Sequence, residues 1–331
     1  MVSGYYSKQR RKTAGKGGEY RLNNDNYLAF DVGGTNVKWG LITSAGTILE
    51  KGSFSAGNGC GETILAAVKE KIAFFRSSVN GIAVSAPGFI HPSTGFIEMG
   101  GAIQEFDQFN LQTYLEEASG LPVSVENDVN CVALAEKWLG SGRELNDFCC
   151  LTIGTGIGGA LFLNNELYRG HAFRGGEFGF MITKGLHNVS PEQDSLSTCA
   201  SMTSIREKYA EYYSLPFEEV TGEKVFEEYD RKNPVAVNII EDFYETLAIG
   251  IYNIVSVLNP EKVLIGGGIT SRPSFLEELK SHLVYIDRVF DLSVDTCHFK
   301  NDSGLIGALA FFKKKYSPDS KKLKTNFERS I

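Results

Sequence analysis

The sequence has few of the features that mark membrane, secreted or fibrous proteins. No apolar run reaches the roughly 18 residues that a membrane-spanning helix needs, and residues 1–24 lack the apolar core of a secretory signal peptide. None of the six cysteines forms a C-x-x-C pair, and a chain of 331 residues needs no disulfides, so we expect reduced thiols and a cytoplasmic location. The composition, 42% hydrophobic and 22% charged, excludes disorder, collagen and coiled coil as the main architecture.

Negative charge exceeds positive charge, but only in the body of the chain. The net charge is −7, and residues 1–21 and 313–331 each sum to +5, which leaves −17 between them. Such an acidic body repels nucleic acid and anionic membranes, and we expect neither as a partner. The short basic ends, 1–26 and 317–331, are predicted to be disordered tails.

Short apolar strands that stop at glycine turns recur in both halves of the chain. In the first half we predict strands over 27–32, 37–43, 48–54 and 81–85, and a helix over 62–78. In the second half we predict strands over 123–126, 148–153, 160–163, 166–168 and 262–265, and helices over 129–139, 240–258 and 304–312. The chain is therefore predicted to be an α/β protein of about two domains.

Glycine is in excess, with 36 residues or about 11% of the chain, against an average near 7%. Three clusters, at 33–34, 154–159 and 266–268, directly follow predicted strands. Glycine lets the backbone approach a ligand closely, and successive N–H groups in such turns hold phosphate oxygens. The sequence contains no P-loop motif, and the glycines of 154–159 lie between hairpin strands, which disfavours a dinucleotide fold. We expect two glycine loops to hold one polyphosphate from both sides.

Two carboxylates stand beside these turns. Asp31 ends a strand just before Gly33, Gly34 and Thr35, where it suits Mg²⁺, which binds one or two carboxylates together with phosphate oxygens and water. Asp128 follows a strand at the start of a helix. It is either the base that orients an attacking hydroxyl in phosphoryl transfer or only the N-cap of that helix, and the residues alone leave both open.

The order of these motifs is similar to that of known ATP-binding proteins. D-x-G-G-T, then G-T-G-x-G-G, then G-G-G resembles the actin/hexokinase superfamily. At finer grain, residues 27–315 resemble the ROK family of sugar kinases and repressors, on the segments 31–35 (DVGGT), 86–88 (APG), 126–130 (ENDVN), 154–159 (GTGIGG) and 175–179 (GGEFG). Within the family, residues 85–103 and 126–138 look most like the bacterial β-glucoside kinases.

The resemblance implies a fold and an activity. The fold is α/β, a two-lobed actin-like ATPase (ribonuclease H-like) fold with a central interlobe cleft, its lobes formed by 27–126 plus 304–316 and by 127–303. The activity is ATP-dependent phosphorylation of the 6-hydroxyl of the non-reducing glucosyl unit in β-glucosides such as cellobiose. Glucose or N-acetylmannosamine are the alternative acceptors.

The resemblance also implies site residues. Asp128 would be the catalytic base, and Asp31 would hold Mg²⁺, through water. The sugar would be bound by Asn127, Asn130, Glu177, Gly88 and Gly101. ATP would be bound by Gly33, Gly34, Thr35, Lys38, Gly154, Thr155, Gly156, Gly158, Gly267 and Gly268.

One departure from the family pattern changes the expected ligands. Many members carry a zinc-binding histidine at the position of Phe180, with a cysteine cluster after it. This chain has only Cys199 in that stretch, and a structural zinc site needs about four N or S ligands, so we expect no zinc. Phe180, together with Phe178 and Phe173, suits an open subsite for an aromatic aglycone or a second sugar. The alternative is that these rings belong to the core.

Two further functions remain as alternatives. A sugar-responsive repressor of the same family needs an N-terminal helix-turn-helix, whereas only 26 residues precede the first predicted strand, and they show no helical period. A non-catalytic ATP-dependent chaperone or filament should lack the Asn127–Asp128 pair and the Glu177 turn, which are both present. Homodimers are common in the family, and periodicity gives no indication of one here.

Overall fold

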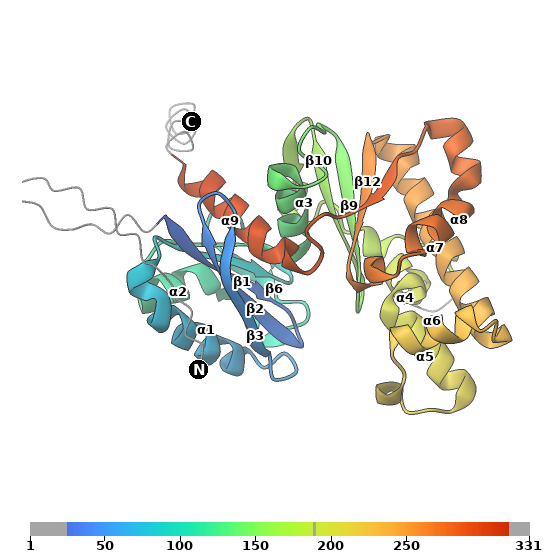
Figure 1. Cartoon of the computed structure of the whole chain (residues 1–331), viewed down its shortest axis with the longest axis horizontal. Coiled ribbons are helices and arrows are strands. Elements are labelled where there is room, and N and C mark those ends of the chain that lie inside the picture. The colour runs from blue at the N-terminus through green and yellow to red at the C-terminus, as the bar shows by residue number, and fades with distance from the viewer. Residues whose placement is uncertain (1–24, 188–189, 318–331) are drawn as a thin grey trace, which may run out of the picture.

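The computed structural model describes residues 25–187 and 190–317 (Figure 1). The predicted tails, 1–26 and 317–331, fall outside the described residues except at their inner ends. Two five-stranded sheets and a small three-stranded sheet form the framework, and helices cover the outer faces of the two large sheets (Figure 1).

The first large sheet has the strand order β3-β2-β1-β4-β8. Antiparallel strands β1 (Asn26–Val32), β2 (Asn36–Thr43) and β3 (Ile48–Ser55) form a meander, and β4 (Ile82–Ala86) and β8 (Val123–Asn127) run parallel to β1. Helices α1 (Gly61–Phe75) and α2 (Leu111–Ser119) cover one face. The helical period predicted for α1 is confirmed, because its buried side chains include Ile64, Val68, Ile72 and Phe75.

The second large sheet repeats this topology in the order β11-β10-β9-β12-β13. Its antiparallel strands are β9 (Phe148–Ile153), β10 (Ile157–Leu163) and β11 (Glu166–Tyr168), and β12 (Lys262–Gly266) and β13 (Val294–Thr296) continue it in parallel. Its outer face packs on α4 (Leu196–Ala200), α5 (Met202–Tyr213), α6 (Gly222–Asp230), α7 (Pro234–Leu258) and α8 (Phe275–Phe290).

Two helices lie side by side between the large sheets: α3 (Asp128–Leu139) and α9 (Ser303–Tyr316) (Figure 1). One apolar cluster joins them to the first sheet and another joins them to the second. They cross at Gly307, where a Cβ atom would lie 1.7 Å from the carbonyl oxygen of Cys131. Helix α9, the last helix among the described residues, therefore packs on the first sheet, far from its neighbours in sequence.

The predicted elements are confirmed, with shifted ends. Strand β10 begins at Ile157 and includes Gly158 and Gly159, which sequence analysis placed in a loop. No side chain fits at either glycine, because a Cβ at Gly158 would lie 2.5 Å from Val129 and one at Gly159 would lie 2.2 Å from Phe178. Sequence analysis missed helices α2, α4, α5, α6 and α8, strand β13 and the small sheet of β5 (Phe89–Ile90), β6 (Phe96–Met99) and β7 (Phe109–Asn110).

Candidate active site

Asp31 lies near the end of β1, where residues of β2, β4 and α9 approach it. Its Oδ1 accepts a hydrogen bond from the Ser85 hydroxyl (2.8 Å), and its Oδ2 accepts one from the Lys38 ammonium (3.2 Å). The first turn of α9 lies against the same carboxylate, since a Cβ at Gly304 would be 2.3 Å from Asp31 Cγ. The Asp31 side chain therefore lies beside both a lysine and the N-terminus of a helix.

The N-cap of α3 is Asn127, and not Asp128. The Asn127 Oδ1 accepts from the backbone N–H groups of Val129 (3.0 Å) and Asn130 (3.1 Å). Asp128 occupies the first turn of the helix, and its Oδ1 accepts from the backbone of Val129 (2.9 Å). The alternative that Asp128 only caps the helix is therefore wrong, because the preceding residue does so.

The Asp128 carboxyl has a strongly altered proton affinity. Burial raises its pKa from an ordinary value of 3.8 to about 7, with further contributions from the negative charges of Asp31 and Glu177. A carboxyl with a pKa near 7 can gain or lose a proton at neutral pH, as a general base must. Asp31, Asp128 and Glu177 thus lie close enough for their charges to interact.

Asn127 also connects α3 to the turn after β4. Its amide donates to the carbonyl oxygen of Gly88 (3.0 Å). Gly88 has a φ of +98°, and a Cβ there would lie 1.9 Å from the Met99 carbonyl oxygen, so only glycine fits. Gly101 faces the same turn, since a Cβ there would lie 3.6 Å from the Gly88 nitrogen. The structure therefore brings Asn127, Gly88 and Gly101 together.

Asn130 is buried within α3, and its amide donates to Glu126 Oε1 (3.1 Å). Glu126 is 1% exposed and forms an ion pair with Arg169, which follows β11 in the second sheet. Sequence reasoning missed this pair. The one available signal was a glutamate at the buried end of a predicted strand, where a charge needs a partner.

Glu177 is half-buried, and burial raises the pKa of its carboxyl while the charge of Arg174 lowers it. The surrounding segment reaches across to the small sheet. Arg174 pairs with Glu98 (3.0 Å), and the Phe173 ring lies 4.6 Å from the ring of His91. Residues near Glu177 therefore contact an element that belongs to the first half of the chain.

The three phenylalanines proposed for an open subsite have different surroundings. Phe178 is 7% exposed and belongs to the core of the second lobe, so for this ring the core alternative is right. Phe180 is 64% exposed. Phe173, which contacts His91, is partly exposed. Only Phe173 and Phe180 are available to a ligand.

The glycine clusters of the second lobe lie next to each other. Strands β9 and β12 are parallel neighbours, and a Cβ at Gly267 would lie 2.1 Å from the Ile153 carbonyl oxygen. At Gly154 and Gly268, by contrast, a Cβ would meet no atom within 4 Å. The backbone at these two positions is open on the side where a side chain would stand, so a ligand can approach it closely.

Strand β10, which follows the turn at Gly154, packs on the start of α3. A Cβ at Gly158 would be 2.5 Å from Val129, the neighbour of Asp128. In the first lobe, the Gly33 N–H donates to the Asn36 carbonyl (3.0 Å) and closes the turn between β1 and β2. Gly34 packs on Ala102, and Thr35 and Thr155 are exposed.

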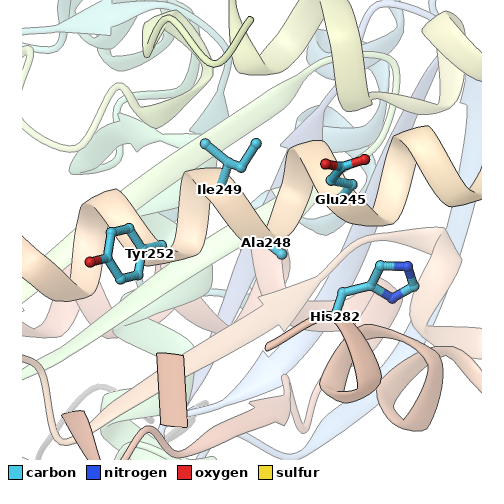
Figure 2. A pocket seen from close by; sticks show the side chains of 5 residues that line it. All are labelled: Glu245, Ala248, Ile249, Tyr252 and His282. Atoms are coloured by element: carbon cyan, nitrogen blue, oxygen red, sulfur yellow. The ribbon is translucent and has the colours of Figure 1, made fainter. Parts of the chain in front are cut away.

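Two cavities lie outside this group of residues. One, of about 200 Å³, lies between α7 and α8, and Figure 2 shows the side chains that line it: Glu245, Ala248, Ile249, Tyr252 and His282. The other, of about 280 Å³, lies at the C-terminal ends of α3 and α9.

Among the described residues, no three His, Cys, Asp or Glu side chains are grouped to hold a metal ion, and no helix there is long and apolar enough to cross a membrane.

The two lobes have the same strand order, and strands in both lobes end at glycine turns. This arrangement defines the class of protein. This is the actin-like ATPase fold, as in the solved structures that the chain matches. Residues 27–315 match the model of the ROK family, and the chain belongs to that family.

Individual relatives match over nearly their whole length. A β-glucoside kinase of Listeria monocytogenes is 46% identical over 284 residues, 86% of this chain and 96% of the relative. The structure of a Listeria monocytogenes protein described as a candidate N-acetylmannosamine kinase has a TM-score of 0.83 and 45% identity, covering 88% of this chain and 99% of that one. A ROK glucokinase of Streptomyces griseus, solved with glucose and AMPPNP, has a TM-score of 0.72 over 86% and 98% of the two chains; at 22% identity it shows the fold alone.

Proposed function

We propose that this protein is a β-glucoside kinase, which transfers a phosphoryl group from ATP to the 6-hydroxyl of the non-reducing glucosyl unit of substrates such as cellobiose. The observation that carries the proposal is the 46% identity to a β-glucoside kinase over 96% of that protein. The geometry around Asp128 supports it, because a carboxyl with a pKa of about 7 begins α3, whose Val129 packs on the strand that follows the open turn at Gly154.

In this proposal Asp128 accepts the proton of the attacking hydroxyl. Its position in the first turn of α3 is fixed by the Asn127 cap and by the contact between Gly158 and Val129. Phosphoryl transfer depends mainly on positioning and charge, so a base held on a rigid helix end is well suited to it. Asn127, Asn130, Gly88, Gly101 and Glu177 would bind sugar hydroxyls, and the Asn130 amide also donates to Glu126.

The described residues fit ATP and Mg²⁺. Open backbone at Gly154 and Gly268 leaves room for a nucleotide, and Gly33, Gly34, Thr35, Lys38, Thr155, Gly156, Gly158 and Gly267 would complete its site. Bound ATP supplies the phosphoryl group, and Asp31 would hold Mg²⁺ through water, since Mg²⁺ keeps several waters and needs few carboxylates. The absence of a zinc site stays an expectation.

We also propose that residues 27–126 plus 304–316 and residues 127–303 move as two lobes that close over the substrates. The packing of α9 on β1, β4 and β8 supports this division. Closure excludes water and so limits wasteful hydrolysis of ATP.

All six cysteines are free thiols, which accords with a cytoplasmic enzyme. A homodimer belongs to the same proposal, and light scattering in solution tests it.

The identity of the acceptor sugar is the most specific part of the proposal. Phe173 and Phe180 are available to stack on an aglycone or a second sugar, which a free hexose does not carry. The candidate N-acetylmannosamine kinase among the matched structures makes that sugar the second candidate. ADP release should be measured with cellobiose, gentiobiose, salicin, glucose and N-acetylmannosamine. We expect the highest kcat/KM for a β-glucoside; a preference for glucose or N-acetylmannosamine would contradict this assignment.

A further inference from the structure

The cavity of about 280 Å³ lies at the far end of the two helices that begin at the active site. Helix α3 carries Asp128 in its first turn and Lys137 and Trp138 in its last. Helix α9 starts against Asp31 and carries Lys313 and Lys314 in its last turn. Because Asp128 lies in the first turn of α3 and the cavity lies at its last turn, the length of α3 separates the two. Figure 1 shows the course of this helix between the large sheets.

Two aromatic rings, together with Leu134 and Ala310, form the apolar part of the cavity wall. Phe162 on β10 is stacked on Phe148, with ring centroids 5.1 Å apart. Trp138 is held against the β2–β3 turn, where a Cβ at Gly46 would lie 3.2 Å from its ring. These contacts fix the rings in place. The Lys313 ammonium lies 4.9 Å from the centre of the Trp138 ring, and the Lys137 ammonium lies 5.8 Å from the centre of the Phe162 ring, so the aromatic and basic parts of the wall adjoin each other.

The rest of the wall is basic. Lys137, Lys313 and Lys314 line the cavity, and no acidic side chain is among its lining residues in the described part of the chain. Lys137 donates to the carbonyl oxygens of Arg143 (3.1 Å) and Leu145 (2.7 Å), and Lys313 donates to that of Ser44 (2.6 Å).

A nearby carboxylate neutralises only part of this charge. Lys314 pairs with Glu166 at 2.5 Å, and both side chains are mostly exposed, so the pair is weak. An ammonium group has three donors, and the contacts of Lys313 and Lys314 leave donors for a ligand. Excess positive charge beside aromatic rings is complementary to an anion that carries a ring.

We propose that this cavity is a second ligand site, which binds a phosphate monoester carried on a single ring. The three lysines would bind the phosphate as point charges, Trp138 and Phe162 would contact the ring, and the Asn165 amide, also in the wall, would bind a ring substituent. The volume is just below the roughly 300 Å³ at which small-molecule sites begin, so the ligand is small. A phosphorylated monosaccharide and an aryl phosphate share this chemistry.

Trp138 itself reports binding, because the chain has only two tryptophans. In a Trp39→Phe variant, fluorescence is followed during titration with glucose 6-phosphate, phenyl phosphate, glucose and inorganic phosphate. We expect a saturable change with at least one phosphorylated ring and none with glucose or inorganic phosphate. The probe that gives the tighter binding identifies the ring. Calorimetry on the unsubstituted chain repeats the titrations without relying on Trp39→Phe.

The double variant Lys313→Gln/Lys314→Gln should weaken this binding at least about tenfold, equal to about 1.4 kcal/mol, because two charge-assisted contacts are lost. Lys280→Gln, the same change at an exposed lysine on α8, should leave it unaltered. Binding that survives in the double variant reports the active site and overturns the proposal, as does no saturable binding by either method. Kinase activity is measured separately with cellobiose, so its absence would count against the proposed function and not against this site.

Discussion

The guanidinium of Arg169 and the carboxylate of Glu126 form a buried ion pair between the two large sheets. Glu126 ends β8 in the first sheet, and Arg169 follows β11 in the second. Glu126 Oε1 also accepts from the backbone of Asn127 and from Asn130, the residues that begin α3. One carboxylate thus fixes the start of α3 to both large sheets.

Replacement of Arg169 should destabilise the fold more than any exposed ion pair does. Arg169→Met leaves the Glu126 charge buried without its partner, so we expect a loss of about 3–5 kcal/mol in the free energy of unfolding, measured with urea. Arg174→Met, which breaks the exposed pair with Glu98, should cost about 1 kcal/mol or less. Adding Glu126→Gln to Arg169→Met should restore part of the loss. Equal effects of the two arginine variants would show that the buried pair is not needed.

Asp128→Asn should abolish most turnover while the protein stays folded. An amide cannot accept the hydroxyl proton, and general bases contribute about 10²–10⁴ in rate. We expect kcat for cellobiose to fall by that factor, with little change in its KM, in a steady-state ADP-release assay. A kcat within a few-fold of the original would remove Asp128 from the catalytic role.

The same substitution should stabilise the protein at alkaline pH. The pKa of Asp128 is higher in the folded state, about 7, than its ordinary value of 3.8, so the native state holds the proton more tightly. Native stability therefore falls as pH rises between these two values, and the loss persists above them. Asp128→Asn lacks this loss, and we expect its Tm to exceed that of the original protein at about pH 8 but not at about pH 4. A Tm difference that does not depend on pH would argue against the raised pKa.

The acid limb of the pH profile should report the charges around Asp128. Because Asp128 must be deprotonated to act as a base, kcat/KM for the sugar should decrease below about pH 7. Asp31→Asn removes a negative charge that raises the Asp128 pKa, so the limb should move to lower pH even though activity falls. Glu177→Gln should produce a smaller shift in the same direction. If kcat/KM decreases over the same pH range in all three proteins, a group other than Asp128 titrates there.

Two glycines can test the nucleotide site without disturbing the fold. Alanine at Gly154 or Gly268 meets no protein atom within 4 Å, so Tm should be unchanged. If the backbone there approaches ATP, the added methyl should raise KM for ATP about tenfold, or about 1.4 kcal/mol, and leave KM for the sugar unaltered. An unchanged KM for ATP in both variants would place the nucleotide elsewhere.

Gly307→Ala is the matched contrast, since its Cβ would lie 1.7 Å from a backbone oxygen of α3. Overpacking of this kind should cost about 3 kcal/mol or more in unfolding free energy, which urea titration measures. Wild-type stability would show that α3 and α9 can separate at little cost.

Local patterns predicted the strands and their glycine turns because both are encoded within a few residues. The alternatives that depended on tertiary contacts could not be decided. Phe178 and Phe180 look equivalent in sequence, yet one is core and the other is exposed. The helix start was predicted one residue late, and whether Asn127 or Asp128 capped it required the backbone geometry. The pairing of Glu126 with Arg169 joins separate sheets, and no periodicity encodes such a contact.

Helix α9 also constrains the order in which the protein can fold. Residues 303–316 supply much of the apolar cluster that covers one face of the first sheet, yet they follow every strand of the second large sheet in the sequence. During translation, one face of the first sheet therefore stays uncovered until α9 emerges, unlike the usual case in which domains complete themselves in order. That face is thus exposed to aggregation, and to chaperones, throughout the synthesis of the second large sheet.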